Sequence, residues 1–142
     1  MRSVRFLMVL YLIAAGFVSG TAAQERESCS NASLHGSFGL RATGNTTTGG
    51  ALIVLGRFTF DGAGNLTAKL FTRTPAGTNI ADTYTGSYSV DSDCIVTDFW
   101  RADTTGVVTT HVSVIVNNGK GYYILNTTQG APNIISGEAT RQ

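Results

Sequence analysis

The segment from Ile95 to Arg101 places a carboxylate beside aromatic residues at the spacing of a β-strand. Alternate residues of a strand share a face, so Asp98 lies on the same face as Val96 and Trp100. Turned inward, Asp98 would be a buried carboxylate beside aromatic rings, which suits ligand binding or acid–base chemistry. Turned outward, it would pair with Arg57 or Arg73, and we favour this outward arrangement.

Aromatic residues of other strands could line an interior cavity together with this segment. Tyrosines would offer hydroxyl groups as polar contacts for a ligand, although buried tyrosines also serve as ordinary core residues. The predicted ligand-binding residues are Phe58, Tyr84, Tyr88, Asp98 and Trp100.

Metal-binding and nucleophilic motifs are absent from the sequence. His35 and His111 are the only histidines, and neither forms a cluster with zinc-like spacing. Residues 61–65 resemble the start of a calcium loop, but Ala63 and Leu66 stand where such a loop needs a ligand and a glycine. This segment therefore predicts a hairpin turn, and we predict no metal, no cofactor and no catalytic residue.

The first 23 residues have the parts of a secretory signal peptide. Arg2 and Arg5 give a basic start, Phe6–Val18 is an apolar run, and Thr21–Ala23 is a small-residue cleavage site. The apolar run has about 13 residues, short of the roughly 20 that span a bilayer. We therefore predict cleavage after Ala23, a secreted or periplasmic location, and no membrane insertion of the mature chain.

Cleavage would leave residues 24–142 as a single domain of 119 residues (142 minus 23). Without Arg2 and Arg5 the chain keeps 8 basic and 9 acidic residues, a formal charge of −1 with no basic cluster, which predicts no nucleic-acid partner. Cys29 and Cys94 are an even number of cysteines in an exported chain, and they predict one disulfide.

The mature sequence lacks helical periodicity and repeats β-rich runs about every 8 to 14 residues, separated by Gly, Asn and Asp clusters. Tight-turn residues follow the second, fourth and sixth runs, whereas most of the other connections are longer. This meander predicts an all-β, antiparallel, eight-stranded up-and-down barrel of lipocalin-like or allene-oxide-cyclase-like architecture, with a β-sandwich as the alternative. The expected strands are Ser33–Thr43, Ala51–Phe60, Leu66–Arg73, Asp82–Val90, Cys94–Ala102, Val107–Val116, Gly121–Asn126 and Ile134–Arg141.

Alternation within the strands predicts which side chains point inward. In the second strand the more apolar face is inward, and Gly56 on that face eases the bend of a small barrel. In the sixth strand the valine-rich face is inward, and His111 is outward. The predicted inward residues of these strands are Leu52, Val54, Gly56, Phe58 and Phe60, and Val108, Thr110, Val112, Val114 and Val116.

The cysteine positions predict the geometry of one barrel end. Cys29 precedes the first strand and Cys94 opens the fifth, so both lie at the tight-turn end, on opposite sides of the ring. The lead-in Cys29–Ala32 must then cross this end as a plug. Any binding mouth is expected at the other end, near the longer loops Gly44–Gly50, Thr74–Ala81 and Thr127–Asn133.

Several motifs of the chain resemble a family of small exported bacterial proteins. They are Cys29-Ser30, Leu34-His35-Gly36-Ser37-Phe38-Gly39, Phe58-Thr59-Phe60-Asp61-Gly62-Ala63-Gly64-Asn65, Gly86-Ser87-Tyr88-Ser89-Val90 and Asp93-Cys94. The resemblance implies secretion, a disulfide and a β-fold. Its motifs are turn and core motifs, so it implies no active site.

Together these features predict a non-enzymatic exported barrel that binds a small, largely apolar ligand at its longer-loop end. One alternative is a self-associating extracellular or envelope subunit, because both faces at the start of Ala51–Phe60 are apolar. A second alternative is an enzyme that uses Asp98, His111 or a tyrosine inside the barrel.

Overall fold

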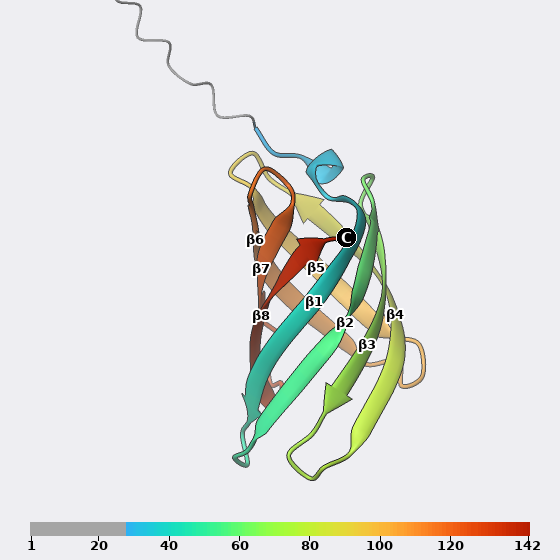
Figure 1. The fold of residues 1–142 in the computed structure, drawn as a ribbon, viewed down its shortest axis with the longest axis vertical. Helices are drawn as coiled ribbons and strands as arrows, with labels where there is room; N and C mark the ends of the chain where they lie inside the picture. Colours follow the sequence, from blue (N-terminus) through green and yellow to red (C-terminus); the bar gives the residue numbers. More distant parts are fainter. Residues whose placement is uncertain (1–27) are drawn as a thin grey trace, which may run out of the picture.

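A computed structural model describes residues 28–142, which form one closed barrel of eight antiparallel strands (Figure 1). Each strand pairs with the next in sequence, and the first pairs with the last. The predicted up-and-down barrel is confirmed and the sandwich is excluded, while the predicted signal peptide lies outside the described residues. The strands are β1 (His35–Thr46), β2 (Ala51–Asp61), β3 (Asn65–Arg73), β4 (Asn79–Val90), β5 (Ile95–Ala102), β6 (Val108–Val116), β7 (Gly121–Asn126) and β8 (Asn133–Arg141).

Tight turns join β2 to β3, β4 to β5 and β6 to β7 at one end of the barrel, as the sequence predicts. In the first of them the Asp61 carboxylate accepts hydrogen bonds from the backbone N–H groups of Ala63, Gly64 and Asn65 at 2.7–3.0 Å. In the β6–β7 turn Asn117 adopts a left-handed backbone with φ 54°, a conformation that Asn tolerates better than most residues. We call this the plugged end, and the opposite end, which carries the longer connections, the open end.

A short plug covers the plugged end (Figure 1). It comprises the disulfide Cys29–Cys94, with a Cα–Cα distance of 4.9 Å, and the 3-10 turn η1 (Asn31–Ser33). The Tyr88 hydroxyl donates to the backbone carbonyls of Leu34 and Asn31, at 2.9 and 3.0 Å, and the Leu34 side chain is fully buried. These contacts confirm the predicted crossing of the barrel end by the lead-in to the first strand.

No helix within residues 28–142 is long and apolar enough to cross a membrane.

The half of the barrel next to the plug is filled by aromatic side chains. Phe60 packs edge-on against Phe38 and Tyr88 with ring centroids 5.5 and 5.0 Å apart, and Tyr122 lies 5.6 Å from Phe38. Phe38 and Phe58 are completely buried. Such close contacts among large rings leave little free volume in this half.

The predicted orientation is confirmed for β2 and wrong for β6. On β6 the side chains of His111, Ser113 and Ile115 are buried, whereas Val112 and Val114 are exposed. The pairing with β5 explains this, since His111 lies directly opposite Asp98 and both point inward. Each polar side chain thereby gains a buried hydrogen-bond partner, and valine tolerates an outward position on a sheet.

Glycines let the strands approach closely where the barrel bends. A Cβ atom on Gly56 would collide with the backbone carbonyl of Lys69, and one on Gly86 with the carbonyl of Phe99. These collisions explain why glycine stands at both positions, while the predicted role of Gly56 in easing a bend stays a prediction.

Candidate functional site

A cavity of about 190 Å³ occupies the open half of the barrel. Half of its lining residues are aliphatic, and the others are Tyr84, Trp100 and five polar residues, without any Lys, Arg, Asp or Glu. The lining residues are Leu40, Ala42, Leu52, Val54, Leu70, Thr72, Tyr84, Trp100, Thr109, His111, Ile124, Asn126, Asn133 and Ile135.

On β1 and β2 the inward side chains become smaller toward the open end, which leaves room for the cavity. Along β1 the inward residues run Phe38, Leu40, Ala42 and Gly44 from the plugged end outward. Along β2 they change from phenylalanine at the plugged end to Val54 and Leu52 at the open end. Smaller side chains at the same barrel circumference leave a space that the chain itself does not fill.

Asp98 and His111 form a buried pair beside this cavity. Nδ1 of His111 lies 2.9 Å from Oδ1 of Asp98, and their side chains are 5% and 4% exposed. The His111 ring stacks on Trp100 with centroids 3.6 Å apart and planes 25° from parallel. His111 and Trp100 line the cavity, whereas Asp98 lies behind them. Among residues 28–142 this is the only contact within ion-pair distance.

The favoured outward placement of Asp98 is therefore wrong. Its side chain points inward and pairs with His111 rather than with Arg57 or Arg73. Burial raises the pKa of Asp98, and the hydrogen bond from His111 opposes this effect. Burial also raises the pKa of Tyr122 well above its usual value, with the nearby Asp98 charge as a second cause.

A chain of hydrogen bonds fixes the state of the His111 ring. The backbone N–H of Thr128 donates to Oδ1 of Asn126 at 3.0 Å, which turns the Asn126 amide nitrogen toward Nε2 of His111 at 3.4 Å. An amide nitrogen only donates, so Nε2 is the acceptor and Nδ1 carries the hydrogen that Asp98 accepts. His111 thus holds a lone pair at the cavity wall, where it can accept a hydrogen bond.

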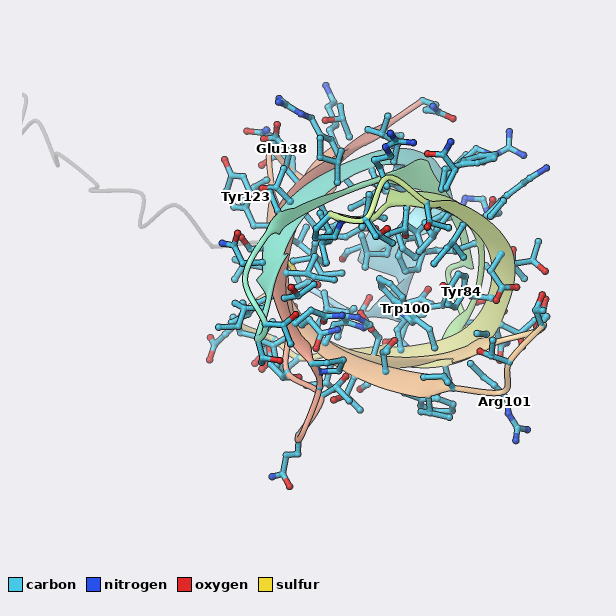
Figure 2. The ribbon with its side chains drawn as sticks, turned by 90° about the horizontal axis from the view of Figure 1, so that it is seen from below. Tyr84, Trp100, Arg101, Tyr123 and Glu138 are labelled. Atoms are coloured by element: carbon cyan, nitrogen blue, oxygen red, sulfur yellow. A yellow bond between two sulfur atoms is a disulfide. The ribbon has the colours of Figure 1, made fainter. Side chains whose placement is uncertain are left out.

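The structure separates the five predicted ligand-binding residues. Tyr84 and Trp100 line the cavity and project into the barrel interior (Figure 2). Phe58 is completely buried against Trp100, with ring centroids 4.6 Å apart, and does not line the cavity. Tyr88 lies at the plugged end, where its hydroxyl holds the plug. Asp98 acts on the cavity only through His111.

Tyr84 is the aromatic residue nearest to solvent in the cavity wall, since it is half-buried whereas Trp100 is buried. Burial and the charge of Asp82 raise the pKa of Tyr84, so its hydroxyl stays protonated. It can therefore both donate and accept a hydrogen bond near the open end.

Sequence reasoning missed Asn126 as part of the site and named His111 only in the enzyme alternative, although one signal for the position of His111 opposite Asp98 was present. The connection Asp103–Gly106 is short, and a hairpin centred between Thr104 and Thr105 places Asp98 opposite His111. The observed register has this pairing. Asn126 carries no comparable signal, because its position depends on pairing with β6 and on the Thr128 contact.

The part of the chain that the structure describes contains no candidate metal site. No three His, Cys, Asp or Glu side chains of residues 28–142 gather where they could hold a metal ion.

The fold and the cavity define a small up-and-down barrel with a ligand-sized interior. No model of a protein family matches the chain, and no curated protein matches it.

Solved structures of designed barrels share the fold. One is a de novo designed fluorescence-activating barrel, with a TM-score of 0.54 and 14% identity over 77% of this chain and 94% of that chain. The redesigned barrel mFAP0 bound to DFHBI has a TM-score of 0.56 and 15% identity over 77% of this chain and 99% of that chain. The redesigned barrel mFAP1 bound to DFHBI has a TM-score of 0.55 and 15% identity over 78% of this chain and 97% of that chain. At these identities the likeness establishes the fold alone.

Proposed function

We propose that this protein is an exported, non-enzymatic barrel that binds a small, largely apolar molecule in its open half. The cavity beside Trp100 and His111 carries the proposal, because its wall is mainly apolar with a few polar groups. Ligand sites in proteins typically have this composition. Designed barrels of the same fold bind the fluorophore DFHBI, and this supports the proposal because a barrel of this architecture can hold a small molecule.

The cavity volume limits the size of the ligand. An apolar cavity of about 150 Å³ holds one benzene molecule, whereas drug-sized ligands occupy about 300–1,000 Å³. A cavity of about 190 Å³ therefore fits one ring with a few substituents.

The predicted signal peptide and the disulfide support a site of action outside the cytoplasm. The Cys29–Cys94 bond persists in an oxidising compartment and is uncommon in the cytosol.

Trp100 offers a direct test, because it is the only tryptophan of the chain and lines the cavity. Single-ring aromatic compounds such as toluene should change its fluorescence in a saturable way. Val54→Phe should weaken this binding by about tenfold or more, since Val54 lines the cavity between the small residues Ala42 and Thr72.

Leu55→Phe is the matched control. Leu55 is the next residue on the same strand, is 52% exposed and lies outside the cavity. The Leu55→Phe substitution should therefore leave the affinity for single-ring compounds unchanged. Equal effects of the two substitutions, or no saturable response to any single-ring compound, would contradict the proposal.

Self-association is a second candidate, and the outer face of β6 and β7 favours it. Val112 lies opposite Leu125, and Val114 opposite Tyr123. These four side chains are 37–56% exposed, and Figure 2 shows Tyr123 pointing away from the barrel. A continuous apolar face of this kind suits contact with another protein surface.

Light scattering at increasing protein concentration tests this candidate. Self-association through this face should be lost in Val114→Lys and kept in Thr67→Lys, a control on the outward face of β3, away from β6 and β7. A strictly monomeric wild-type protein at all concentrations would exclude the candidate.

A further inference from the structure

We infer that the cavity selects a neutral aromatic molecule with a hydroxyl group, a phenol-class ligand that donates its hydroxyl hydrogen to Nε2 of His111. This inference rests on the proposed function and names the chemical class that the same cavity takes.

The acceptor atom Nε2 of His111 has a fixed orientation, but the hydrogen bond that it accepts within the protein is long. Asp98 occupies Nδ1 at 2.9 Å and fixes the tautomer that leaves a lone pair on Nε2. The amide nitrogen of Asn126, which donates to Nε2, lies 3.4 Å from it, beyond the usual hydrogen-bond distance of about 2.7–3.2 Å. A ligand hydroxyl can approach more closely than this amide, which is anchored through Thr128.

The lone pair faces the cavity. Nδ1 points to Asp98, which lies behind the cavity wall, whereas Nε2 points to Asn126, which lines the cavity with His111. The group that His111 offers to a ligand is therefore a hydrogen-bond acceptor. Buried polar groups are almost always hydrogen-bonded, so a ligand with a matching donor is favoured over one without.

The charges around the cavity disfavour an ionic ligand. No Arg or Lys lines the cavity, so a carboxylate or phosphate would lose its hydration without gaining a cation. The carboxylate of Asp98 behind His111 adds repulsion to any anion. An ammonium group carries several hydrogens to satisfy, whereas a phenol carries a single donor that matches the single lone pair.

The shape of the cavity favours an aromatic ring. Its volume of about 190 Å³ suits one ring, half of its lining residues are aliphatic, and Trp100 and Tyr84 provide aromatic contacts. The hydroxyl of a phenol is also a stronger hydrogen-bond donor than that of an aliphatic alcohol of the same size.

Calorimetric titration of the full chain with 4-methylphenol, toluene, 4-methylanisole, 4-methylbenzoate and 4-methylbenzylamine tests the inference. We expect 4-methylphenol to bind about tenfold more tightly than toluene or 4-methylanisole, neither of which can donate. The two ionic compounds should bind more weakly still. A purely apolar cavity would give the opposite order for 4-methylphenol and toluene, because burying an unbonded hydroxyl is unfavourable.

The double substitution Asp98→Leu with His111→Phe removes the acceptor without leaving a buried charge. It should reverse the preference, so that toluene binds more tightly than 4-methylphenol. Ring ¹⁵N spectra of the wild-type protein give an answer that needs no variant. Nε2 of His111 should be unprotonated in the free protein, and its resonance should shift on addition of 4-methylphenol and not of toluene.

The outcomes separate this inference from the proposed function. If none of the compounds binds, the proposed function fails. If toluene, 4-methylanisole or an ionic compound binds as tightly as 4-methylphenol, the cavity is a binding site but the phenol inference is overturned. A protonated Nε2, or one that 4-methylphenol leaves unchanged, overturns it as well.

Discussion

His111→Phe should leave the Asp98 carboxylate buried without its hydrogen-bond partner. The two side chains are 5% and 4% exposed and lie 2.9 Å apart, so water cannot replace the lost contact. Leaving a buried charged group without its hydrogen-bond partner costs about 3 kcal/mol or more. We expect the free energy of unfolding to fall by about this amount at neutral pH, although phenylalanine can keep the stacking on Trp100.

The double variant Asp98→Leu/His111→Phe should recover most of this loss. Replacing both partners of a buried pair with apolar residues is often neutral or stabilising. We therefore expect its free energy of unfolding to lie within about 1 kcal/mol of the wild-type value or above it, since both replacements are apolar. Urea unfolding followed by circular dichroism, with similar slopes for all three proteins, provides the comparison.

The free energy of unfolding of His111→Phe should be lower than that of the double variant, and this deficit should depend on pH. Burial raises the folded-state pKa of Asp98, and the substitution removes the hydrogen bond that opposes this rise. A carboxyl group whose pKa is higher in the folded than in the unfolded protein destabilises the fold only when it is ionised. Its contribution to the free energy of unfolding is therefore most favourable below the unfolded-state pKa of about 3.9. Stability is then lost as the pH rises through the folded pKa.

The deficit should accordingly be small near pH 3 and complete only above the folded pKa of Asp98. A loss below about 1 kcal/mol at neutral pH, a deficit that does not change with pH, or a double variant as unstable as the single one would refute this reasoning.

Three further perturbations test the plugged end. Replacing Cys29 and Cys94 together with serine opens a loop of 65 residues and should cost at most about 4 kcal/mol in chemical denaturation; an unchanged unfolding midpoint would mean that the bond does not constrain the unfolded chain. Tyr88→Phe removes the hydroxyl that holds the plug and should cost about 1 kcal/mol, with faster amide exchange at Leu34; unchanged exchange would contradict its role. Hydrogen bonds led by that from the Asn65 side chain lower the pKa of Asp61 from 3.8 to about 2, so its stabilisation is present above pH 3.8 and is lost as the pH falls toward 2. Asp61→Asn should therefore flatten the acid dependence of stability over that interval, and an acid titration of folding identical to wild type would count against it.

The barrel itself could be predicted from the sequence because its connections carry clear signals. Short Asn-, Asp- and Gly-containing turns alternate with longer loops, so successive hairpins open at opposite ends. Two cysteines placed before the first and fifth strands then define the plug. These features are local or follow from strand order, and they did not require knowledge of side-chain packing.

The orientation of β6 could not be read from its alternation alone. In this barrel both faces of a strand carry β-branched residues, and Val112 and Val114 fit an exposed sheet surface as readily as an interior. The deciding interaction is the pairing of Asp98 with His111 across two strands. The cavity was equally hidden, because it depends on how the inward side chains of several strands decrease in size together.

Intermolecular nuclear Overhauser effects with 4-methylphenol test most directly whether the open half of the barrel binds a small molecule. We expect contacts from the ligand ring to the methyl groups of Val54 and Ile124, which line the cavity, and none to those of Leu55 and Leu125 on the outer face. Contacts confined to the outer methyl groups would contradict this expectation.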